Sequence, residues 1–121
     1  MTEPRLPDCL THILDAIGRI QDYVAGLSRE DFEVDELRQD GVIRNLEVIG
    51  EASNRIVSRY PDFARAHPEL ELSVAYRMRN ALAHGYFSIN LDTVWDTIAH
   101  DLPGLASAIR AARDASRHGE P

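Results

Sequence analysis

The sequence has a single cysteine and no long hydrophobic run. Cys9 stands alone among 121 residues, which excludes an internal disulfide and a zinc site made of several thiolates. No apolar run approaches the roughly 20 residues that a membrane-spanning helix needs. Residues 1–5 are mixed in charge and lack the apolar core of a secretory signal. We therefore expect one soluble, cytoplasmic domain spanning residues 1–121.

The sequence also has no lysine. All 13 basic residues are arginine, and 20 acidic residues outnumber them to give a net charge of −7. This charge disfavours sequence-independent binding to nucleic acid, which depends on neutralising phosphates. The use of arginine alone follows either from a GC-rich genome or from the bidentate phosphate contacts that guanidinium groups make. Any binding of RNA is therefore expected at a local cleft and not over a broad basic surface.

Hydrophobic residues repeat at helical spacing in four segments, and no segment alternates in the manner of a β-strand. The first predicted helix covers residues 8–24, and Ser28 is expected to cap a short turn after it. The second covers residues 35–60 and is stopped by Pro61. A linker over residues 62–68 leads to a third helix over residues 69–84, which Gly85 ends.

The last predicted helix begins at a cap formed by Asn90 or Asp92. Pro103 should kink or break this helix, because proline lacks an N–H and clashes with the preceding turn. The chain after Arg113 is a polar tail. We predict an all-α fold, an antiparallel bundle of four or five helices whose core covers about residues 8–110.

The second helix has two distinct faces. Its apolar seam consists of Val42, Leu46, Ile49, Ser53, Ile56 and Tyr60. Its charged row consists of Arg44, Glu47, Glu51 and Arg55. Gly41 and Gly50 weaken the helix, so each is expected to allow the close approach of another helix. Two such faces exceed the needs of one bundle contact, and we therefore expect a symmetric dimer.

The segment 77–87 carries the side chains best suited to chemistry. Asn80 and His84 are four residues apart and share one helix face, with Arg79 on the neighbouring strip. Gly85 lets the backbone turn, which can carry Tyr86 back toward Arg79 and His84. These four side chains are therefore expected to converge at one helix end.

Together, these side chains suit the cleavage of a phosphodiester. The Arg79 fork can hold a phosphate, and His84 can move a proton near neutral pH. Asn80 can orient His84 or a phosphate oxygen, and Tyr86 can donate a hydrogen bond. The segment contains no carboxylate, which indicates a reaction without metal or cofactor, in which the RNA 2′-hydroxyl attacks and leaves a cyclic phosphate. A structural role is the alternative, because a histidine near a helix C-terminus also interacts favourably with the helix dipole.

The same segment resembles the R-x4-H-x-Y signature of the HepT-like branch of the HEPN superfamily, with Arg79, His84 and Tyr86 at the matching positions. Residues 44–52 resemble the family's second-helix block around Gly-Glu-Ala. Residues 94–98 and 101–105 resemble its last helix. The resemblance covers about residues 8–110, and it departs from the family where residues 71–73 replace a frequent Pro-Trp pair.

This resemblance implies the toxin of a type VII toxin–antitoxin system, a ribonuclease with Arg79 and His84 as catalytic residues. It implies a homodimer in which two motifs face a shared cleft for RNA. It also implies a cognate nucleotidyltransferase antitoxin of the MNT type, which transfers AMP from ATP to Tyr86. The added bulk and negative charge beside Arg79 would repel phosphate. Glu51, in the matching Gly-Glu-Ala block, either reaches Arg79 or pairs with arginines of its own charged row.

Two other classes of function remain open. In one, the chain is a non-catalytic subunit that binds a nucleotide or substrate for the nucleotidyltransferase. In the other, it is a dimeric helical adaptor that catalyses no reaction. A neighbouring nucleotidyltransferase gene would favour the toxin or the non-catalytic subunit over the adaptor, and growth arrest on expression without that partner would favour the toxin over the non-catalytic subunit.

Overall fold

The fold is all-α, as predicted. The computed structural model describes residues 5–72, 75 and 91–118, with side chains as far as residue 115, and these residues contain helices and turns but no strand. Within these ranges, no helix combines the length and the apolar character that crossing a bilayer requires.

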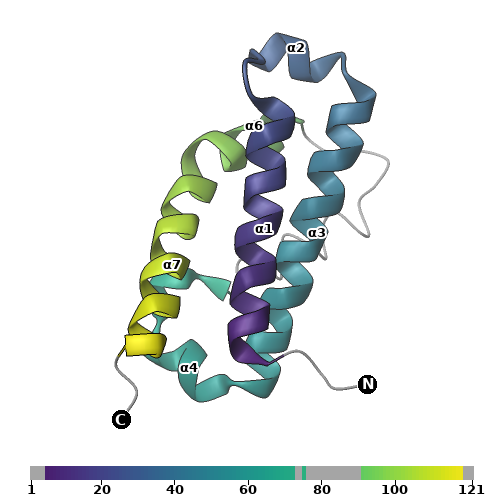
Figure 1. The fold of residues 1–121 in the computed structure, drawn as a ribbon. Helices are drawn as coiled ribbons and strands as arrows, with labels where there is room; N and C mark the ends of the chain where they lie inside the picture. The colour runs from purple at the N-terminus through teal and green to yellow at the C-terminus, as the bar shows by residue number, and fades with distance from the viewer. Residues whose placement is uncertain (1–4, 73–74, 76–90, 119–121) are drawn as a thin grey trace.

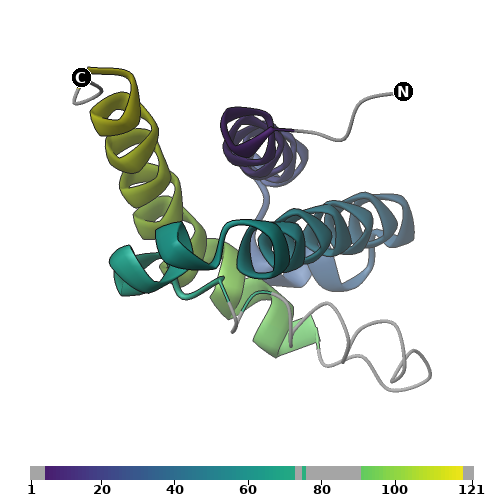
Figure 2. The ribbon, with the colours of Figure 1, turned by 90° about the horizontal axis from the view of Figure 1, so that it is seen from below.

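Three long helices make the bundle. They are α1 (Leu6–Val24), α3 (Glu36–Arg59) and α7 (Leu102–His118), and α1 runs antiparallel to the other two (Figure 1). The short helix α2 (Arg29–Glu33) connects α1 to α3 at the end of the bundle opposite the start of α1. At the other end, α4 (Pro61–Ala66) and the 3-10 turn η1 (Pro68–Leu70) carry the chain from α3 toward α7 (Figure 2).

Local capping signals set the helix boundaries. Ser28 Oγ accepts a hydrogen bond from the Asp31 N–H (3.1 Å), which confirms Ser28 as the cap of α2. Asp35 Oδ1 accepts a hydrogen bond from the Arg38 N–H (3.1 Å) at the start of α3. The first two predicted helices, residues 8–24 and 35–60, match α1 and α3 to within two residues.

The apolar seam of α3 lies in the domain's own core. It packs mainly against α1, and its buried members are Val42, Leu46, Ile49, Ser53 and Ile56. The predicted close approach is confirmed at Gly41, where a Cβ atom would lie 2.9 Å from Tyr23 Cε2. Because the seam is buried in the core, it is not available to a second copy, whereas Arg44, Glu51 and Arg55 of the charged row are exposed.

The predicted linker over residues 62–68 is wrong, because these residues form α4 and η1. Pro61 is the first residue of α4, a position where its missing N–H costs nothing. The predicted start of the third helix at Glu69 is also wrong. Glu71 adopts a left-handed conformation (φ 48°), and the next helical turn begins after it, with the Ala75 N–H donating to the Glu71 carbonyl at 3.2 Å. The rest of that predicted helix, Gly85 included, lies outside the described residues.

The last helix consists of α6 (Leu91–Asp96), the π-helical turn η2 (Thr97–Asp101) and α7. Asp92 lies inside the first turn of α6, so its prediction as the cap is wrong, while Asn90 lies outside the described residues. The helix continues through Pro103 and changes direction between α6 and α7 (Figure 1). The Leu102 N–H bonds to the Thr97 carbonyl five residues back, so the predicted kink takes the form of a widened turn directly before the proline.

Candidate functional site

The four motif residues Arg79, Asn80, His84 and Tyr86 lie outside the described residues, and their convergence stays a prediction. The structure describes the elements on both sides of the segment that carries them. On the amino side these are η1 and the helical turn at Leu72 and Ala75. On the carboxyl side it is α6.

On the amino side, the chain is anchored in the core. Leu70 and Leu72 are buried, on either side of the left-handed Glu71. His67 Nδ1 lies 2.8 Å from Glu69 Oε2, and the Phe63 ring packs on the imidazole with centroids 4.4 Å apart. The hydrogen bond from His67 lowers the pKa of the Glu69 carboxyl. The part of the chain described before residues 77–87 is therefore held in the core by Leu70 and Leu72.

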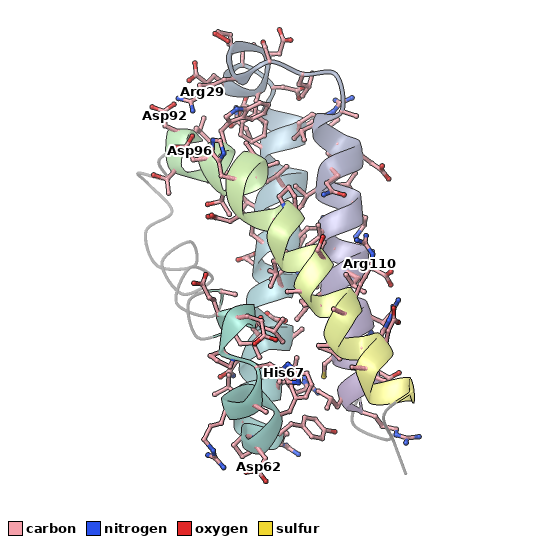
Figure 3. The ribbon with its side chains drawn as sticks, turned by 90° about the vertical axis from the view of Figure 1, so that its left-hand side faces the viewer. Arg29, Asp62, His67, Asp92, Asp96 and Arg110 are labelled. Atoms are coloured by element: carbon pink, nitrogen blue, oxygen red, sulfur yellow. The ribbon has the colours of Figure 1, made fainter. Side chains whose placement is uncertain are left out.

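On the carboxyl side, α6 is held against α2. The Arg29 guanidinium donates to Asp96 Oδ1 at 2.7 Å and to Asp92 Oδ1 at 3.4 Å, and all three side chains meet at one end of the molecule (Figure 3). The Phe32 and Trp95 rings pack with centroids 5.4 Å apart. Trp95 is half-buried against the core. The described elements on both sides of residues 77–87 are thus packed on the bundle.

A cavity of about 410 Å³ lies between α3, η1 and the η2–α7 junction. Its apolar wall is formed by Leu46, Ile49, Leu70, Ala75, Leu102 and Leu105. Its polar lining is formed by Glu69, Glu71, His100 and Asp101, which are exposed, and by the buried Thr97. Sequence reasoning did not single out His100, because the π turn that places it in this lining has no signature in the helical spacing. Since Ala75 is part of the wall, the cavity borders the turn that leads into the motif segment.

Glu51, the fifth predicted site residue, lies on the exposed side of α3. Arg44 and Arg55 of the same charged row are also exposed, and Glu47 is half-buried. The contact of Glu51 with Arg79 involves a residue outside the described part of the chain and remains a prediction.

Comparison with known proteins gives the family. The model of the family described as "Ribonuclease HepT-like" matches residues 13–112. A protein of Thermococcus cleftensis named "Probable ribonuclease HepT" is 39% identical over 106 residues, covering 88% of this chain and 94% of the relative. A Caldanaerobacter subterraneus protein named "Putative RNase" is 32% identical over 101 residues, covering 84% and 88%. No solved structure matches significantly. The chain belongs to the ribonuclease HepT-like family.

Proposed function

We propose that this chain is the toxin of a type VII toxin–antitoxin system, a cytoplasmic endoribonuclease that works without metal. The family match carries this proposal, because residues 13–112 include the complete Arg79-x4-His84-x-Tyr86 motif. The name of the Thermococcus cleftensis relative supports ribonuclease activity.

The proposed reaction is an in-line transfer within the RNA. The 2′-hydroxyl oxygen bonds to the adjacent phosphorus while the bond from phosphorus to the 5′-oxygen breaks. His84 takes the proton from the 2′-hydroxyl or returns one to the leaving 5′-oxygen. Arg79 holds the phosphate and stabilises the charge that develops on it. Asn80 orients His84 or a phosphate oxygen, and Tyr86 donates a hydrogen bond.

The experiment that tests this activity uses purified protein and end-labelled single-stranded RNA in the presence of EDTA. We expect fragments with a 2′,3′-cyclic phosphate at one end and a 5′-hydroxyl at the other. Fragments with 5′-phosphates, or cleavage that requires added magnesium, would contradict the metal-free mechanism. A failure to cleave any RNA would instead favour the non-catalytic subunit that binds a nucleotide or substrate for a nucleotidyltransferase.

We also propose a cognate nucleotidyltransferase of the MNT type that inactivates the toxin by transferring AMP to Tyr86. The added phosphate would compete with RNA for Arg79. Incubation with that partner, ATP and magnesium should add mass in steps of one adenylate and abolish cleavage. Tyr86→Phe should escape modification, because it lacks the acceptor oxygen and keeps the ring. An adenylate on another residue, or full activity after Tyr86 is modified, would refute this switch.

The proposed active form is a symmetric homodimer, in which two motifs share one cleft. Since the seam of α3 is buried in the core, we place the exposed charged row of α3 at the contact with a second copy. Light scattering should give twice the 13.6 kDa mass of the chain. A monomer at tens of micromolar would count against the shared cleft but not against the chemistry.

A further inference from the structure

The turn from α2 into α3 exposes two large hydrophobic side chains. Val34 is 84% exposed and Leu37 is 80% exposed, and within the described ranges no other large hydrophobic residue is as open. We call residues 29–40 the α2–α3 corner. It forms the end of the bundle opposite the start of α1 and the end of α7 (Figure 1).

The fold does not use these two side chains. Val34 directly precedes the cap of α3, where an apolar residue often packs on the fourth residue of the helix. That fourth residue is Gln39, which instead donates to the carbonyls of Phe32 (2.9 Å) and Glu33 (3.1 Å). The core contact of the corner is made by Phe32, which is fully buried. The exposure of Val34 and Leu37 is therefore unexplained by the packing of the domain.

The corner is also strongly acidic. Its six carboxylates and two arginines give a net charge of −4, more than half of the −7 of the whole chain. Asp35 pairs with Arg38 at 3.3 Å, and Arg29 is held by two aspartates of α6. Four carboxylates are exposed without an ion pair to any residue that the structure describes: Glu30, Glu33, Glu36 and Asp40.

We infer that the α2–α3 corner is a docking surface for a partner protein whose contact face has apolar side chains bordered by arginine or lysine. Exposed apolar patches with a polar rim mark protein interaction sites, and Val34 and Leu37 lie three residues apart in one acidic corner. The carboxylates near Val34 and Leu37 in the sequence would attract a partner with a basic contact face and increase its association rate. RNA is repelled by the same carboxylates. A second copy of the chain would bring one acidic corner against another.

This surface is linked to the rest of the molecule through Arg29. Its bonds to Asp92 and Asp96 fix the corner to α6, which follows the motif segment along the chain. The corner therefore packs on the element that follows that segment along the chain. The inference goes beyond the proposed function and does not depend on RNA cleavage.

The test measures how tightly the protein binds a labelled synthetic peptide, an amphipathic helix with leucine on one face and lysine on the other. A second peptide has glutamate in place of each lysine. The apolar variant is Val34→Ser with Leu37→Gln, and the charge variant is Glu33→Gln with Glu36→Gln. The matched control, Asp15→Asn with Asp22→Asn, removes the same charge from exposed positions of α1. All of these positions are exposed, so each variant should keep the melting temperature of the parent.

We expect the lysine peptide to bind the parent and the α1 control equally, and to bind the apolar variant about 10-fold more weakly. The charge variant should bind more weakly at low salt and show a smaller salt dependence. Equal binding of the glutamate peptide, equal weakening by the α1 control, or no binding at all would overturn the inference. Loss of self-association or of RNA binding in the apolar variant would overturn it too, because a second copy or RNA would then occupy the corner.

Discussion

Arg29 of α2 and Asp96 of α6 meet at 2.7 Å, although 67 residues separate them along the chain. Asp92 lies one helical turn before Asp96 and binds the same guanidinium at 3.4 Å. The contact joins the α2–α3 corner to α6, the helix that follows residues 77–87 along the chain. Since both partners are largely exposed (42% and 57%), its energy is limited by solvent screening.

Arg29→Ala should lower the free energy of unfolding by up to about 1 kcal/mol, the range of exposed ion pairs. Urea unfolding at low salt and at high salt measures the loss, which should shrink as salt screens the charges. In a double-mutant cycle with Asp96→Asn, the two losses should be less than additive. Strict additivity would show that the two side chains do not interact in solution.

Gly41→Ala should destabilise the protein, whereas Gly18→Ala should stabilise it. Both glycines lie inside helices, where alanine is favoured by about 0.5–1 kcal/mol. A Cβ at Gly18 meets no atom within 4 Å, but a Cβ at Gly41 lies 2.9 Å from the Tyr23 ring. Overpacking of this kind costs about 1–3 kcal/mol. In a Tyr23→Ala background, Gly41→Ala should become stabilising in urea unfolding, and a persistent loss would refute the contact.

Cys9 should resist thiol reagents until the protein opens. The side chain is 1% exposed, and its burial raises the pKa of the thiol, so the reactive thiolate is both inaccessible and disfavoured. The folded state favours the protonated thiol of Cys9. The stability that this protonated thiol contributes should be lost as the pH rises from the ordinary thiol pKa through the raised pKa of the folded state. Labelling followed by mass spectrometry should be slow in buffer and fast in denaturant. Rapid labelling in buffer would contradict the packing of α1.

His67→Ala should raise the pKa of the Glu69 carboxyl toward its ordinary value. The hydrogen bond from His67 is the main cause of the lowered pKa. A lowered carboxyl pKa favours the folded state above the ordinary value of about 4.3, and this contribution is lost as the pH falls through the folded-state pKa. An NMR titration of the Glu69 side chain compares the two proteins. An unchanged titration would show that the 2.8 Å contact is absent in solution.

Arg79→Ala and His84→Ala should each lower the rate of RNA cleavage by about 10²–10³-fold. The first removes the proposed phosphate clamp and the second removes the proton transfer. We expect both proteins to keep their fold, which circular dichroism checks. A folded variant that cleaves RNA as fast as the parent would exclude that residue from the catalytic machinery.

The sequence by itself determined the long helices and the family. Helical periodicity and caps such as Ser28 and Asp35 are local signals, so the boundaries of α1 and α3 follow from a few neighbouring residues. The seam of α3 follows from the same spacing. Arg79, His84 and Tyr86 were identified from their motif, which needs no knowledge of the fold.

Other features were decided only by the tertiary structure. The left-handed Glu71 and the π turn before Pro103 lie where the chain passes between η1, α3 and α7, and spacing alone does not place either of them. The partner of Arg29 lies on α6, far along the chain, so no local pattern pairs them. Val34 and Leu37 are of residue types that usually lie in a core, but here Phe32 is the buried residue of the corner and both side chains are exposed to solvent. The difference is physical, because helix spacing and capping act between neighbours, whereas burial and ion pairing depend on which distant surfaces meet.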